Sequence, residues 1–157
     1  MIRVRINTFV GALLVLLAVT AVACQGGGDG GSADGNVQEV RVRMTDQVSF
    51  EPATITVDAG QPVRLEVDNV ATGSIHDFTV LDIAVTRVEA NGGSTDMGHG
   101  AMGAGEFALH IALDPESEGV LEFTPLEEGE YRFVCTVAGH EGAGMVGTLI
   151  VEAADLS

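Results

Sequence analysis

The stretch Tyr131-Arg-Phe-Val-Cys-Thr-Val-Ala-Gly-His-Glu-Gly-Ala-Gly-Met-Val-Gly-Thr-Leu-Ile-Val151 decides the fold of this chain. Apolar residues alternate towards both of its ends, which predicts β-strands over about 131–135 and 145–152. Between these strands, Cys135, His140 and Met145 follow one another at intervals of five residues. The glycines of the loop allow it to bend tightly, so we expect the three side chains to face one central point.

Short alternating runs occupy most of the chain before this stretch. They predict six more strands, at about 40–44, 54–57, 62–67, 75–83, 107–113 and 120–123. No segment has the 3.6-residue apolar period of an amphipathic helix. About eight short strands with regular turn signals indicate an all-β domain, an antiparallel sandwich or barrel with Greek-key connections. The glycine-rich segment 84–106 is expected to be an irregular loop, either functional or disordered.

The spacing of sulfur and imidazole side chains points to a metal. His76 lies 59 residues before Cys135, near the start of a predicted strand. A thiolate, two imidazoles and a weakly bound thioether form the ligand set of an electron-transfer copper centre, whereas zinc sites rarely use methionine. The sequence therefore predicts one copper ion. Its expected ligands are His76, Cys135, His140 and Met145.

Each of these residues also has an ordinary explanation. A lone cysteine at the end of an apolar strand is commonly a buried core thiol, and a methionine in a glycine-rich loop commonly packs against the core. His76 and Asp77 alone would suit a polar surface pair. The ordered spacing of all four residues favours a metal site, and a sandwich that has lost its metal stays an alternative.

The same segments resemble the cupredoxins, the blue (type 1) copper proteins, and in particular their plastocyanin, azurin and auracyanin group. The quoted stretch resembles their C-terminal signature, Ser74–Val80 their first-ligand strand, and Phe50–Gly60 their N-terminal strands. The resemblance covers about residues 38–153. It implies a cupredoxin-like Greek-key sandwich with a type 1 copper held by the same four residues.

One position departs from the family pattern. Asparagine often follows the first histidine of a cupredoxin and ties the two ligand segments together by hydrogen bonds. This chain has Asp77 there, with Thr136 as its expected partner. An aspartate keeps the acceptor but lacks the amide donor, which is expected to affect the reduction potential.

Two further histidines lie outside this set. The segment Met97-Gly-His99-Gly-Ala-Met102 combines side chains that bind Cu(I), so it is a candidate auxiliary copper loop, with a flexible solvated loop as the alternative. His110 alternates with the apolar positions of its strand, so we expect it to be exposed or half-buried and not a ligand.

The N-terminus has the features of an export signal. Arg3 and Arg5 precede an uncharged apolar stretch over 9–23, which is short for a membrane span. We interpret residues 1–24 as a lipoprotein-type signal peptide ending at Cys24, 25–37 as a glycine-rich flexible tether, and 38–157 as the copper domain. Cleavage without lipidation, or an uncleaved anchor, is the alternative.

The two cysteines support this organisation. If Cys24 carries lipid, Cys135 has no disulfide partner, and a metal would occupy its thiol in an oxidising compartment. The expected localisation is a lipid anchor on the cell membrane, facing the periplasm or the cell exterior.

The charge of the chain restricts its partners. It has 23 acidic residues, only 7 basic ones and a net charge of −16. This balance argues against binding of nucleic acids, whose phosphates require lysine and arginine. The acidity suits solubility or adaptation to salt, and it would also attract redox proteins with a basic docking face.

These features together predict a blue-copper electron carrier that cycles between Cu(I) and Cu(II) and serves the membrane-associated redox partners of an electron-transport chain. The alternative is an extracytoplasmic copper-binding or copper-delivery protein without a redox role. An enzyme is not expected, because copper oxidases need further sites built from His-X-His pairs, which this sequence lacks. Nothing in the sequence indicates an oligomer, and a monomer is expected.

Overall fold

A computed structural model describes residues 37–93 and 107–154 of the chain. Its ten strands are β1 (Gln38–Thr45), β2 (Ser49–Glu51), β3 (Thr54–Asp58), β4 (Val63–Asn69), β5 (His76–Val80), β6 (Val85–Gly92), β7 (Leu109–Leu113), β8 (Ser117–Pro125), β9 (Gly129–Val134) and β10 (Val146–Glu152). No helix with the length and hydropathy of a membrane span occurs in this described part.

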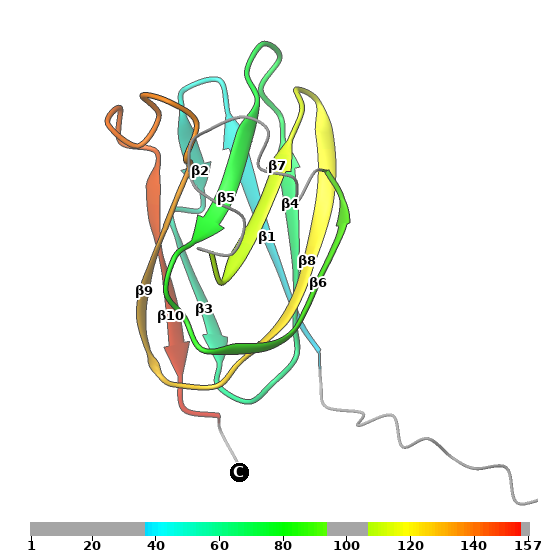
Figure 1. Ribbon diagram of the computed structural model, residues 1–157, viewed down its shortest axis with the longest axis vertical. Coiled ribbons are helices and arrows are strands. Elements are labelled where there is room, and N and C mark those ends of the chain that lie inside the picture. Colours follow the sequence, from blue (N-terminus) through cyan, green and yellow to red (C-terminus); the bar gives the residue numbers. More distant parts are fainter. Residues whose placement is uncertain (1–36, 94–106, 155–157) are drawn as a thin grey trace, which may run out of the picture. The chain divides into compact units, whose positions relative to one another are not determined.

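The strands form two five-stranded sheets that pack face to face (Figure 1). One sheet has the order β2-β1-β4-β8-β6, and the other has the order β3-β10-β9-β5-β7. The prediction of an all-β sandwich is therefore confirmed. All eight predicted strands are present, with ends that differ by a few residues.

The structure corrects the sequence prediction in two respects. The segment 84–106 was expected to be irregular, but β6 occupies Val85–Gly92. This strand is at the edge of its sheet and most of its residues are exposed, so it lacks the alternation that marks a half-buried strand. The pairing is also not purely antiparallel, since β1 runs parallel to β4 and β3 runs parallel to β10.

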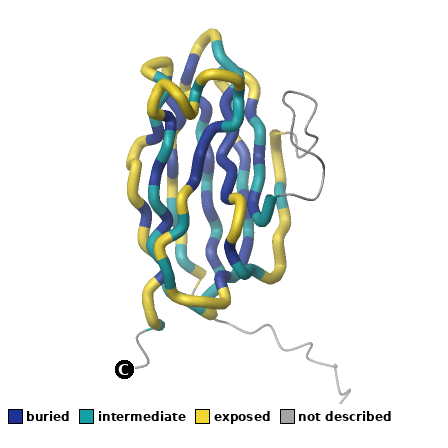
Figure 2. The backbone as a smooth tube through the Cα atoms, turned by 60° about the vertical axis from the view of Figure 1, so that its left-hand side comes forward, coloured by how far each residue is buried: buried dark blue, intermediate teal, exposed yellow. Residues whose placement is uncertain are grey.

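The core lies between the sheets and follows from strict alternation in the central strands. In β4, every second residue from Val63 to Asn69 is buried. Figure 2 shows that buried positions run along the strands, whereas exposed positions dominate the loops at both ends. Phe50, Phe78 and Phe133 contact one another in this core, and Phe50 stands edge-on to both of the others.

The topology brings the predicted ligands to one end of the sandwich. His76 is the first residue of β5, Cys135 directly follows β9, and Met145 directly precedes β10. Because β9 is antiparallel to both β5 and β10, these three positions lie at the same end of the sheet. The start of β1 and the end of β10 lie at the opposite end of the sandwich (Figure 1).

Candidate metal centre

Three ligand atoms converge at this end of the molecule. The Nδ1 atoms of His76 and His140 lie 3.1 Å apart. The Sγ atom of Cys135 lies 3.8 Å from His76 Nδ1 and 3.4 Å from His140 Nδ1. His76 and Cys135 are fully buried, whereas His140 is half-buried. The sequence therefore identified three side chains that the fold does bring together.

The size of this triangle fits a metal ion. A first-row ion such as zinc binds imidazole nitrogen at about 2.0–2.1 Å and thiolate sulfur at about 2.3 Å. Three such donors spread in a plane around one ion are about 3.5–3.8 Å apart. The observed separations of 3.1–3.8 Å are of this size.

The loop between β9 and β10 holds the third and fourth candidates. The backbone N–H of Met145 donates to the carbonyl of His140 at 3.0 Å, and the N–H of Cys135 donates to the carbonyl of Met145 at 3.2 Å. Gly139 and Gly144 have φ angles of +88° and +101°, which favour glycine. The Met145 side chain is buried and belongs to the same core cluster as Cys135.

The surroundings favour a metal-bound thiolate over a free one. Burial, together with the nearby Asp77 carboxylate, raises the pKa of the Cys135 thiol to about 11. Burial and the neighbouring His140 lower the pKa of His76, which keeps its imidazole neutral and able to bind a cation. The N–H of Asp77 lies 3.5 Å from Sγ and donates to the sulfur. A bound cation would supply the positive charge that a thiolate needs here.

Asp77 connects the two ligand segments, as the sequence suggested. Its Oδ1 atom accepts from the N–H of Thr136 at 2.9 Å, and its Oδ2 atom accepts from the Thr136 hydroxyl at 2.8 Å. Only 3% of Asp77 is exposed. The carboxylate therefore fixes the backbone immediately after Cys135 relative to the strand that begins with His76.

Asn69 is a supporting residue that the sequence analysis did not single out. Its buried side-chain amide donates to the carbonyls of Ser74, Leu113 and Asp114 at 2.9–3.0 Å. Its Oδ1 atom accepts from the N–H of Ala71. These bonds anchor the connection that leads into His76. The Asp-Asn pair at the end of a predicted strand signalled only a turn, because its long-range partners are set by the tertiary structure.

His140 reaches the surface among small residues. Ala138 and Ala143 are exposed beside it, and Val137 and Val146 are half-buried. The nearest ion pair of this loop joins Glu141 to Arg132 of β9 at 2.6 Å. The half-buried imidazole edge thus lies in a mostly apolar surface.

The sequence analysis also named candidates other than these clustered residues. Cys24 and the Met97, His99 and Met102 loop are outside the described residues. His110 is half-buried, as expected, and is not among the three clustered ligands.

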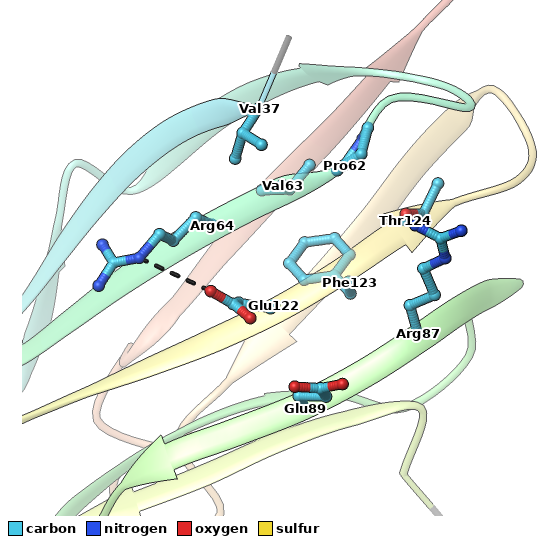
Figure 3. Close-up of a pocket in the computed structure, with 9 residues that line it drawn as sticks. All are labelled: Val37, Pro62, Val63, Arg64, Arg87, Glu89, Glu122, Phe123 and Thr124. Atoms are coloured by element: carbon cyan, nitrogen blue, oxygen red, sulfur yellow. Dashed lines mark ion pairs between the residues drawn. The ribbon is translucent and has the colours of Figure 1, made fainter. Parts of the chain in front are cut away.

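A pocket of about 260 Å³ lies on the other sheet (Figure 3). Its lining contains none of the predicted copper ligands: Val37, Pro62, Val63, Arg64, Arg87, Glu89, Glu122, Phe123 and Thr124. Arg64 forms ion pairs with Glu39, Glu66 and Glu122, so its charge is already compensated.

Several known proteins are similar to this chain. The copper-resistant cuproprotein CopI of Rubrivivax gelatinosus is 37% identical over 115 residues, which cover 71% of this chain and 65% of CopI. The chain thus aligns with slightly less than two thirds of that relative. Auracyanin-A of Chloroflexus aurantiacus is 27% identical over 95% of this chain and 99% of its own length.

The fold of this chain is also similar to the folds of solved structures. Auracyanin from the photosynthetic bacterium Roseiflexus castenholzii superimposes with a TM-score of 0.56 at 18% identity, over 73% of this chain and 96% of that protein. The profile of the cupredoxin-like domain matches residues 10–151 of this sequence. The chain, with its two β-sheets and its cluster of two histidines and a cysteine, belongs to the cupredoxin-like domain family.

Proposed function

We propose that this protein is a blue-copper electron carrier whose copper is held by His76, Cys135, His140 and Met145. The observation that carries the proposal is the convergence of two imidazole Nδ1 atoms and a buried thiol within 3.1–3.8 Å of one another. Auracyanin A of Chloroflexus aurantiacus, which has the same fold, is described as a blue copper protein.

The chain itself supplies a rigid and partly dry site. When bound, copper supplies exchange of one electron between its Cu(I) and Cu(II) states. His76 and Met145 are fixed by burial, and Cys135 is held by the Asp77 N–H and by the backbone of the β9–β10 loop. Ligands with little freedom to move change position only slightly during electron exchange, which favours fast transfer.

The half-buried edge of His140 is the proposed route for the electron. Its ring is the ligand that reaches the surface, and exposed Ala138 and Ala143 border it. Small apolar residues let a partner approach closely without removing water from charged groups. Acidic side chains elsewhere would orient a basic partner and increase the association rate.

Visible absorption spectroscopy tests the site. The purified protein loaded with Cu(II) is expected to show an intense band near about 600 nm from thiolate-to-copper charge transfer. The variant Cys135→Ser is expected to lose this band. Thr56 is exposed on β3, so Thr56→Val serves as the control and is expected to keep the band. A wild-type protein that binds Cu(II) without this band would contradict the electron-carrier proposal.

A second candidate is copper binding or delivery without a redox role. It is favoured by the 37% identity to CopI, a protein named for copper resistance. The Met97, His99 and Met102 segment would then capture Cu(I). This candidate predicts that a triple alanine substitution there lowers Cu(I) affinity and copper tolerance of cells but leaves electron exchange unchanged. An electron carrier predicts instead that this triple substitution leaves copper tolerance unchanged. It also predicts that Ala143→Glu, which places a charge beside His140, slows the stopped-flow oxidation of the Cu(I) protein.

Export and a lipid anchor at Cys24 complete the proposal. The support is the arrangement of Arg3, Arg5, the apolar stretch and Cys24 in the sequence. Metabolic labelling with a radioactive fatty acid is expected to mark the wild-type protein but not Cys24→Ala. Equal labelling of both would remove the anchor from the proposal.

The proposed partners are redox proteins with a basic docking face, which a monomeric carrier would meet at the membrane. The support is the net charge of −16. The rate of electron transfer to a basic redox protein such as cytochrome c is expected to fall as salt rises from about 0.01 M to 1 M, because screening shortens the range of the charges. A rate independent of salt would argue against electrostatic docking.

A further inference from the structure

A chain of hydrogen bonds leads away from the metal centre to a histidine that the proposed function does not use. The Thr79 hydroxyl donates to Oδ1 of Asp77 at 2.8 Å. The same hydroxyl lies 2.7 Å from Nδ1 of His110. Thr79 is fully buried on β5, and His110 is half-buried on β7.

The strand pairing explains why these three side chains meet. Asp77 and Thr79 are two residues apart on β5, so they point to the same face of the sheet. Thr79 and His110 are directly opposite each other in the antiparallel pair of β5 and β7. Phe78, between them on β5, points into the core with Ile111. The chain of hydrogen bonds therefore lies on the sheet face that does not form the core.

The direction of each bond follows from the chemistry of the groups. A carboxylate only accepts hydrogen bonds, so the Thr79 proton goes to Asp77. The Thr79 oxygen is then free only to accept, and a contact of 2.7 Å requires a hydrogen between the atoms. His110 must therefore carry its proton on Nδ1 and donate it to Thr79. The sequence of donors is His110 to Thr79 to Asp77.

Asp77 depends on these donors because it is buried without a cation. In the part of the chain that the structure describes, no arginine pairs with Asp77. The donors to its carboxylate are the backbone and hydroxyl of Thr136, the hydroxyl of Thr79 and, at 3.9 Å, the thiol of Cys135. When a buried carboxylate loses a donor, its negative charge is less well compensated and the side chain can rotate away from its other partners.

We propose that Thr79 and His110 are positioning residues of the metal centre. They hold the Asp77 carboxylate so that it binds Thr136 and fixes the segment that carries Cys135. The inference rests on the proposed function, because it assigns these two residues to the copper site proposed there. In the described part of the chain, the hydrogen bonds of these two side chains join them to each other and to Asp77, so both act through Asp77.

Two pairs of variants test this assignment in the copper-loaded protein. Thr79→Val and His110→Leu remove one donor each, whereas Thr79→Ser and His110→Asn retain a donor at about the same place. Loss of a donor leaves more uncompensated negative charge near the copper, which favours Cu(II). Thr79→Val is expected to lower the midpoint potential by an amount equal to about a tenfold change in the Cu(II)/Cu(I) ratio, about 59 mV for one electron. His110→Leu is expected to shift it less, in the same direction.

The metal-free protein provides a second measurement. The N–H of Thr136 donates to Asp77, so its exchange with deuterium reports how firmly the carboxylate is held. Thr79→Val is expected to increase the exchange rate of this amide about tenfold, whereas Thr79→Ser keeps it close to the wild-type rate. Thr56→Val, remote from the site on β3, is the matched control for a change from threonine to valine.

The outcomes separate the possibilities. Potentials and Thr136 exchange that do not differ from wild type in Thr79→Val and His110→Leu would overturn the assignment. The assignment is also overturned if Thr79→Ser and His110→Asn do not keep the midpoint potential and the Thr136 exchange rate close to their wild-type values, because a change in packing would then explain the effect. If Thr79→Val does not fold, the comparison of His110→Leu with His110→Asn tests the assignment, since His110 is only half-buried. If wild-type protein lacks the blue band, the proposed function fails, while Thr136 exchange still tests the positioning.

Discussion

At the scale of single residues, burial and the neighbouring Asp77 carboxylate together set the surroundings of the Cys135 thiol. An amide would keep the shape of this side chain and remove its negative charge. Asp77→Asn is therefore expected to favour Cu(I) and raise the midpoint potential by about 59 mV or more, a tenfold change in the Cu(II)/Cu(I) ratio. Cyclic voltammetry measures this shift.

The matched control for this change is Asp58→Asn, at the opposite end of the sandwich on β3. Its charge is remote from the metal centre, so screening by solvent leaves the potential close to the wild-type value. A fall in potential in Asp77→Asn, or an equal shift in both variants, would contradict a specific effect of the buried carboxylate.

The two perturbed ligands also predict how the stability of the metal-free protein depends on pH. Burial raises the pKa of Cys135 from 9.0 to about 11. Between these values the unfolded chain releases a proton that the folded chain retains, so the free energy of unfolding falls as pH rises above about 9. The pKa of His76 is lowered from 6.5, so stability is also lost as pH falls below about 6.5.

Urea unfolding of the metal-free protein at pH 5, 7.5 and 10.5 checks both directions. The comparison with Cys135→Ala isolates the thiol, because other groups titrate equally in both proteins. This variant is expected to lose less stability between pH 7.5 and 10.5 than the wild-type chain does. Parallel losses in the two proteins would show that the thiol is not responsible.

At the scale of elements, β9 and β10 pack closely because of Gly147. It is opposite Phe133 in the pair of strands, and an added Cβ atom would lie 2.1 Å from the Phe133 ring and 2.7 Å from the carbonyl oxygen of Ala53. Gly147→Ala is therefore expected to lower the free energy of unfolding by about 1–3 kcal/mol. Chemical denaturation measures the loss.

Gly73→Ala is the control for this substitution, since an added Cβ atom there has no neighbour within 4 Å. Its effect is expected to stay within about 0.5 kcal/mol. Equal stability of Gly147→Ala and the wild-type protein would mean that Phe133 moves aside without cost.

The elements also differ in how far the sequence predicted them. β4 and β10 are half-buried, so their alternation of apolar and polar residues was visible in the sequence. Among the described strands, β6 bonds only to β8 and it remains mostly exposed, so nothing in its composition distinguished it from a loop. The parallel pairing of β1 with β4 was not predictable, because parallel and antiparallel pairs can bury the same side-chain pattern.

At the scale of the whole molecule, the proposed metal binding would be coupled to folding. The ligands come together only in the folded state, from segments that are 59 residues apart in the sequence. Copper at about 1,000 times its dissociation constant is expected to stabilise the folded chain by about 4 kcal/mol. For a domain of this size, the unfolding temperature should rise by more than about 10 °C.

Calorimetry with and without copper measures this rise. A chelator should reverse it, and His140→Ala should reduce it because one ligand is missing. The same unfolding temperature with and without copper would show that the folded state does not bind the ion.

The sequence alone determined the sandwich class and the identity of the copper-ligand candidates. Alternation is a local property, and the order of Cys135, His140 and Met145 lies within a single loop, so both were visible without a structure. The tertiary structure decided which distant groups meet: His76 with His140, Asn69 with the segment before β5, and His110 with Thr79. These contacts depend on strand register and sheet order, and long-range packing sets both, because a shift of one residue would turn every side chain to the opposite face.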